Sequence, residues 1–443
     1  MNQRPRPTQD DSGSMHGTLL AVAVLMIALL LAPKADAQPR PEAPHDAGRG
    51  QTQTAVPEWV VPGARITQYA MSSQHTKRNR ARDNRWREDD ERARQRDIDA
   101  GLPADEVERR ARQREEQRAS DRRLYNTGTG GYSYVQYDIV AITEDGVLME
   151  VRFYTLNPAT NNLPELSFVI QSKLYDHATG GGLWVTPAMI QRALDGRGDG
   201  ISRAYRAPYT IGEHTYDAVA WVLSSGDTVI RQVYDTATGI QLYQSQITDT
   251  DDLRSHQSTE LAGYRVSELP WVGTRFTEQV RGLRGLAYEG AFVAVMPQTP
   301  GLDRVPDNVH PMKVSIAIQA PAADAIDATT RVEIQGLGPG EPTEQEGVLS
   351  PSHRLGIYIA PEVLAGLERG QVLDEDPVIG YSIRVTDIYQ VDGVTLVELT
   401  EQGQANTHSV VVTYDARVGL QVAYVGHHPS QMRRIELNLT GVE

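Results

Sequence analysis

The acidic residues between Asp195 and Gly200 have the clearest potential for metal chemistry. Acids that alternate with glycine are typical of a calcium loop, in which oxygen ligands occupy positions 1, 3, 5 and 12. Here Arg197 falls at position 3 and Arg206 at position 12, so positive charge stands where ligands belong. We therefore interpret the segment as an ordinary turn.

A second pair of acids, Asp235 and Asp415, could form a catalytic dyad if the two halves of the chain brought them together. Bilobed aspartic proteases pair two such acids, which share a proton. In those enzymes Thr-Gly or Ser-Gly follows the acid, and neither pair follows Asp235 or Asp415. The pattern Tyr-Asp-x-x-x-Gly, which ends at Gly239 and Gly419, instead favours a hairpin turn whose glycine takes the left-handed conformation.

No other residues have the spacing of a known catalytic, cofactor or metal motif. There is no Cys, which excludes disulfides and thiolate chemistry. No nucleophile elbow, phosphate loop or dinucleotide fingerprint occurs. We therefore predict no catalytic residue, no cofactor and no metal ligand. The histidines lack the helical zinc spacing; those considered are His177, His214, His408, His427 and His428.

The elements that would position any site occur twice. Residues 182–196 return as 356–370 at a constant offset of about 174 residues, and each copy predicts a strand, a proline at the first helical turn, an apolar helix face and a terminal glycine. Trp59 and Trp271 open the two copies, each followed by Gly-x-Arg and a strand pattern. The sequence therefore predicts an internal duplication.

The first copy has about 38 more residues than the second between its opening and its centre, and these lie in a segment of Arg, Glu and Asp at about 77–124. Acid-before-base pairs at i,i+4 recur, which indicates a solvated helical hairpin. Solvated decoration and partner binding both fit this arm. The candidate partner-binding residues are Arg85, Trp86, Arg92, Arg109 and Arg112.

The predicted fold is mainly β (α+β): two tandem copies of a curved antiparallel-sheet domain, each with a short helix, with the charged hairpin inserted in the first. A sandwich and an incomplete barrel both fit so many short strands. The predicted order is a signal peptide (1–37), a disordered linker (38–56), repeat 1 (57–247), a linker (248–263) and repeat 2 (264–443).

The N-terminus indicates export. An apolar run at 17–32 is short for a membrane span, and Ala35-Asp36-Ala37 resembles a cleavage site. Cleavage there predicts a secreted or periplasmic protein with no membrane span; a retained anchor and a start at Met15 are the alternatives. The net charge of −15 argues against nucleic acid as a partner.

Three functions remain open from the sequence. The first is an exported cell-envelope binding protein that holds an apolar ligand or a partner segment on its curved sheets. The second is a scaffolding protein that acts through the Arg/Glu-rich arm. The third is a hydrolase whose site the sequence does not reveal, although the absence of motifs favours a protein that is not an enzyme.

Overall fold

The computed structural model describes residues 56–76, 80–100, 102–114, 129–157, 161–196, 201–250, 253–296, 306–322, 324–336, 342–429 and 432–443. The predicted signal peptide and all but the last residue of the 38–56 linker lie outside these ranges. Residues 54–443 belong to one compact unit. None of the described helices combines the length and apolar character needed to cross a membrane.

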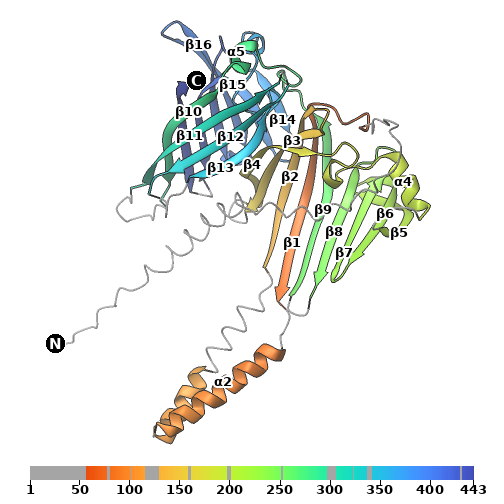
Figure 1. Ribbon diagram of the computed structural model, residues 1–443, viewed down its shortest axis with the longest axis vertical. Helices are drawn as coiled ribbons and strands as arrows, with labels where there is room; N and C mark the ends of the chain where they lie inside the picture. Colours follow the sequence, from red (N-terminus) through yellow and green to blue (C-terminus); the bar gives the residue numbers. More distant parts are fainter. Residues whose placement is uncertain are drawn as a thin grey trace, which may run out of the picture. The chain divides into compact units, whose positions relative to one another are not determined.

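The described chain is mainly β, with two antiparallel sheets and a few short helices (Figure 1). The first sheet has the order β4-β3-β2-β1-β9-β8-β7-β6-β5. Its strands are β1 (Ala64–Thr76), β2 (Thr129–Ile142), β3 (Val147–Asn157), β4 (Leu163–Tyr175), β5 (Ile201–Ile211), β6 (His214–Ser225), β7 (Thr228–Asp235), β8 (Gln241–Asp249) and β9 (Leu253–Val266).

The second sheet has the order β13-β12-β11-β10-β19-β18-β17-β16-β15-β14. Read outward from β1 and β10, the two orders correspond strand for strand, and among the described strands only β14 has no counterpart. Its strands are β10 (Gly285–Ala294), β11 (Asn308–Pro321), β12 (Ile326–Ile334), β13 (Thr343–Leu349), β14 (Val372–Asp376), β15 (Tyr381–Val391), β16 (Val394–Gly403), β17 (Ser409–Asp415), β18 (Gln421–His428) and β19 (Arg433–Val442).

Helices are few and short outside one charged segment. Between β1 and β2 lie α2 (Arg80–Asp99) and a second helical stretch at 104–114. Thr186 caps α4 by accepting a hydrogen bond from the Met189 amide, as its sequence predicts. The remaining helical elements are η2 (Gly180–Gly182), α4 (Pro187–Leu194), α5 (Glu278–Arg281), α6 (Pro361–Leu364) and η3 (Gln404–Asn406).

The similar segments 182–196 and 356–370 each pair with a strand end of their own sheet, at corresponding places. Trp184 forms an isolated bridge with Ile240 in the first sheet, and Tyr358 forms one with Leu420 in the second. This close crossing explains the repeated glycine of the turn. Gly239 has φ 75°, and a Cβ there would lie 2.0 Å from the Val185 carbonyl oxygen. The turn interpretation of Tyr-Asp-x-x-x-Gly is therefore confirmed.

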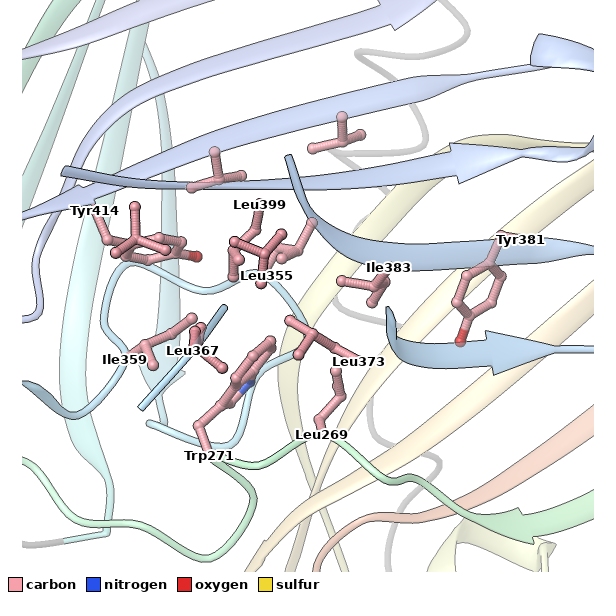
Figure 2. Close-up of a cluster of buried hydrophobic side chains, with 14 of the residues drawn as sticks. Leu269, Trp271, Leu355, Ile359, Leu367, Leu373, Tyr381, Ile383, Leu399 and Tyr414 are labelled. Carbon is pink, nitrogen blue, oxygen red and sulfur yellow. The ribbon is translucent and has the colours of Figure 1, made fainter. Parts of the chain in front are cut away.

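Apolar side chains cover both sheets. In the first, Ile66 and Ile139 pack with Trp184 on one face, while Trp221 and Tyr234 pack against α4 on another part of the sheet. The second sheet has a larger core (Figure 2). It gathers Trp271, Ile359, Leu367, Ile383, Leu399 and Tyr414, and it includes Tyr154 and Leu166 from the first sheet.

Several predicted boundaries need correction. Most of the predicted linker 248–263 is strand β9, which pairs with both β1 and β8. Its polar side chains conceal a strand whose backbone is bonded on both sides. In the second sheet, β13 forms although its sequence contains two glutamates and a glycine. Phe276, predicted to enter a strand, instead precedes α5, which Thr277 caps.

Candidate functional site

The most concentrated group of chemically capable side chains is buried where the two sheets meet. We call it the ionic cluster. No member is more than 7% exposed. It comprises Arg65, Asp138, Glu150, Arg152, His353, Arg354, Asp374, Asp376, Glu401 and His408.

Strand alternation places the first sheet's share of the cluster on one face. Arg65 of β1 lies opposite Asp138 of β2, and Asp138 lies opposite Glu150 of β3. The intervening residues, such as Ile66 and Ile139, belong to the apolar core of the other face. Three adjacent strands therefore present charged groups toward the second sheet.

Arg65 and Arg354 share the carboxylate of Asp138 where the two sheets meet. Arg65 pairs with Asp138 of its own sheet, and its Nη1 lies 2.9 Å from Asp374 Oδ2 and 3.3 Å from Asp376 Oδ2. In the opposite direction, Arg354 Nη2 of the segment after β13 donates to Asp138 Oδ2 at 2.6 Å. Asp138 thus accepts hydrogen bonds from an arginine of each sheet.

The other end of the cluster is built on β3 and β16. Arg152 pairs with Glu150, and its Nη1 lies 3.1 Å from Glu401 Oε2 of the second sheet. Each of these two glutamates also contacts an imidazole. His353 Nδ1 lies 2.9 Å from Glu150 Oε2, and His408 Nε2 lies 3.3 Å from Glu401 Oε1.

The charges control the ionisation of the buried acids. Burial acts to raise the pKa of Glu150, but the Arg152 charge and the hydrogen bond with His353 outweigh it and hold that pKa well below its usual range. Burial likewise acts to raise the pKa of Glu401, but the Arg152 charge and the hydrogen bond with His408 outweigh it, so this pKa is also lowered. Burial raises the pKa of Tyr154 to about 12, so this tyrosine stays a neutral acceptor for Arg354 Nη1 at 2.9 Å.

This arrangement can hold two sheets together more readily than it can act on a substrate. The carboxylates are engaged by arginine or histidine, and the cluster is almost closed to solvent. Removing one partner of a buried, hydrogen-bonded ion pair typically costs about 3–5 kcal/mol, because the other charge is left uncompensated. The chemistry of the cluster is therefore that of a contact between sheets.

Beside the cluster, the second sheet binds the edge strand β4 of the first. We call this the β4 contact. Leu166 is buried in the second sheet's core, and its carbonyl oxygen accepts a hydrogen bond from His428 Nδ1 at 2.9 Å. Thr407 Oγ1 donates to the Pro164 carbonyl at 2.9 Å, and Arg433 Nη2 donates to the Ser167 carbonyl at 2.5 Å. Side chains thus bind the outer backbone of an extended strand.

A polar hollow of about 610 Å³ opens near the turn between β14 and β15. Asp376 and Tyr381 of the second sheet reach it from the cluster side, and Gln404 and Asn406 lie on its rim. Asp376 is already engaged, because its Oδ1 accepts the Val378 and Ile379 amides while its Oδ2 accepts Gln136 and Arg65. The hollow therefore offers neutral polar groups and the exposed Glu375, while its buried acid, Asp376, is already engaged.

The five predicted arm residues are not members of the ionic cluster. Arg85 and Trp86 belong to α2. Arg92 pairs with Glu88 and Asp89 within α2, and Arg109 pairs with Glu106 within the 104–114 stretch. Arg112 is exposed in the 104–114 stretch.

Ion pairs also join the two helical stretches of the arm. Arg94 Nη2 lies 2.5 Å from Glu108 Oε1, and Arg114 Nη1 lies 3.0 Å from Asp97 Oδ2. The described part of the segment is therefore a pair of ion-paired helices.

The acids considered for chemistry have structural partners. Asp235 Oδ2 accepts the Thr238 amide at 2.9 Å, and Asp415 Oδ1 accepts the Arg417 amide at 2.9 Å. Arg197 to Gly200 lie outside the described residues. Within the described residues, no group of three or more His, Asp and Glu side chains is placed to hold a metal ion.

Comparison with known proteins gave no match to a family model, to a curated protein or to a solved structure. The site must therefore be interpreted from its own geometry. Sequence reasoning missed the whole ionic cluster. Its local signal is charge at alternate positions of an apolar strand, as in Glu150 and Arg152 of β3.

Proposed function

We propose that this protein is an exported cell-envelope binding protein that holds an extended polypeptide segment of a partner against its curved sheets. The β4 contact is the observation that carries this proposal. It provides an example, within the chain, of a strand whose side chain enters the core of a sheet while side chains of that sheet bind its backbone. Recognition of extended segments through their backbone is a common mode of peptide binding.

The second sheet's core supports a polypeptide over a free apolar ligand. Tyr154 and Leu166 of the first sheet already fill part of that core. We favour the same origin for both sheets, because their strand orders correspond and the repeated segments occupy corresponding places. In this interpretation the chain is a duplicated sheet domain, and the arm between β1 and β2 is an insertion in the first copy.

Site-specific photo-crosslinking in the cell of origin tests the proposal. A photoreactive residue at Leu223, half-buried beside the α4 core of the first sheet, is expected to crosslink to a polypeptide in the envelope fraction. The same residue at the exposed Val391 is the control. Crosslinking to lipid alone at Leu223, or a protein found only in the cytoplasm, contradicts the proposal.

The charged arm supports a second candidate function, that of a scaffolding protein. Its helices are joined by ion pairs such as Arg94–Glu108, and Ile98 remains 51% exposed. Replacing residues 78–126 by a short glycine-serine linker tests this function. If the arm is the scaffold, the variant loses a defined partner while the sheets unfold as in the unmodified chain. Retention of every partner excludes it.

A further inference from the structure

The outer edges of the two sheets differ at one corresponding position. In the second sheet β15 is covered by β14, whereas in the first sheet β5 is the outermost of the strands that the structure describes. The sequence explains the difference. Ten residues (371–380) separate Gly370 from β15 and include β14, but only four (197–200) separate Gly196 from β5. The first sheet therefore lacks the residues that build this strand.

Register identifies the corresponding backbone groups. Ala218 of β6 lies opposite Asp235, and Leu396 of β16 lies opposite Asp415. Three residues farther along these strands, Trp221 pairs with Ala204 of β5, and Leu399 pairs with Val385 of β15. In the second sheet the Val385 amide donates to the Gln371 carbonyl at 2.9 Å, and its carbonyl accepts the Gly370 amide at 2.8 Å. By this correspondence, the amide of Ala204 faces the open edge.

A buried donor lies one strand away from this edge. Trp221 is 5% exposed, and no described residue accepts a hydrogen bond from its Nε1. A buried polar group without a partner is costly and uncommon in a folded protein. The corresponding Leu399 has no polar group, so the donor is particular to the first sheet.

The charge of β5 indicates what kind of segment would fit. Its described residues include Arg203 and Arg206, both exposed, and no acid. Arg206 contacts Asp217 of β6 at 3.4 Å. In the second sheet the covering strand β14 has the opposite character, with apolar Val372 and Leu373 followed by Asp374, Glu375 and Asp376.

We propose that an extended segment of a partner polypeptide, apolar and acidic like β14, adds as a tenth strand to the outer edge of β5. Its backbone pairs with Ala204, its apolar side chain packs beside Trp221 and Ile201, and one of its oxygens accepts the Trp221 Nε1 hydrogen. Pro208, which cannot donate, limits pairing farther along β5. This inference rests on the proposed function and specifies where the segment binds and what its chemistry is.

A synthetic peptide with the sequence of residues 370–377, added to the full chain without its leader, tests the proposal. The expected result is slower amide hydrogen exchange in residues 201–206 and binding that weakens with salt; a scrambled peptide of the same composition is the control. Ala204→Pro removes the edge donor, and Trp221→Phe removes the indole donor while keeping a ring. Each should weaken binding about tenfold, the loss expected for a hydrogen bond.

The outcomes separate this inference from the proposed function. Protection of β15 instead of β5 means that the peptide displaces β14, which overturns the inference. The inference is also overturned if both variants bind the peptide as the unmodified chain does. If an envelope polypeptide crosslinks at Leu223 while β5 amides stay unprotected by the peptide, the inference fails and the proposed function stands. If neither experiment gives its expected result, both the inference and the proposed function are excluded.

Discussion

Arg354 of the second sheet donates a hydrogen bond to Asp138 of the first across 216 residues of sequence, and both side chains are buried. The same carboxylate also pairs with Arg65. One aspartate therefore accepts from both sheets, and its loss would leave two guanidinium groups without their shared acceptor. The strongest mutational effects should fall on this contact.

Replacing Arg354 by Met is expected to lower the free energy of unfolding by about 3–5 kcal/mol, because Asp138 and Tyr154 lose a buried partner. Urea unfolding followed by circular dichroism measures this loss. Arg331→Met is the matched control, since Arg331 is an exposed arginine paired with Glu333 and its replacement should cost about 1 kcal/mol or less. Equal effects of the two changes would show that the cluster does not hold the sheets together.

The β4 contact should weaken in mild acid. Burial, Arg433 and His408 lower the pKa of His428 to about 3, although its bond to the Leu166 carbonyl acts the other way. An unfolded histidine titrates near 6.5, so between about 6.5 and about 3 the unfolded chain binds the extra proton. Stability is therefore fully present above pH of about 6.5 and falls as the pH drops toward about 3.

The variant His428→Asn tests this dependence, because asparagine can still donate to Leu166 but does not titrate. The slope of unfolding free energy against pH should flatten between about pH 6.5 and 5. His427, exposed on the same strand, provides the control variant His427→Asn. A slope unchanged in His428→Asn would assign the acid sensitivity to other groups.

Leu166→Ala should destabilise the protein by about 2–5 kcal/mol, because it leaves a cavity in the second sheet's core. Leu174 lies on the same strand and is 47% exposed, so Leu174→Ala should cost much less. Thermal and urea unfolding of the two variants measures the difference. Similar small losses in both would mean that β4 does not pack into that core in solution.

Gly239→Ala should destabilise the first sheet by several times the cost of Gly212→Ala. Both glycines have positive φ, 75° and 57°, so both substitutions carry backbone strain of about 1 kcal/mol or more. Only at Gly239 would the added Cβ also meet a backbone carbonyl, that of Val185; nothing lies within 4 Å at Gly212. Calorimetry of the two variants compares the costs, and equal melting temperatures would exclude the close crossing.

The sequence predicts the mainly β fold well where alternation is local. Two stretches rich in β-branched and aromatic residues, 216–223 and 228–234, fall within β6 and β7, and the repeated turns fix where β8 and β18 begin. By contrast, β5 is not predicted, because Pro208 and two arginines interrupt its apolar pattern. Such a composition suits an edge strand, which only the sheet order reveals.

The ionic cluster could not be predicted because its partners are distant in sequence. Arg65 and Asp374 are 309 residues apart, and neither stands in a recognisable motif. A charged residue at an alternate strand position normally indicates a solvated face. Here a second sheet covers that face, and which face is covered depends on packing between sheets.

The position of β1 beside β9, and of β10 beside β19, has a consequence for synthesis. In each sheet the first strand to leave the ribosome must wait for the last one before its second edge is paired. A stop codon at Arg433 would remove β19 from the middle of the second sheet and leave β10 and β18 without a shared neighbour. Premature termination near the end should therefore be as damaging as a break in the centre, and a nascent chain should remain exposed to chaperones and proteases until translation is nearly complete.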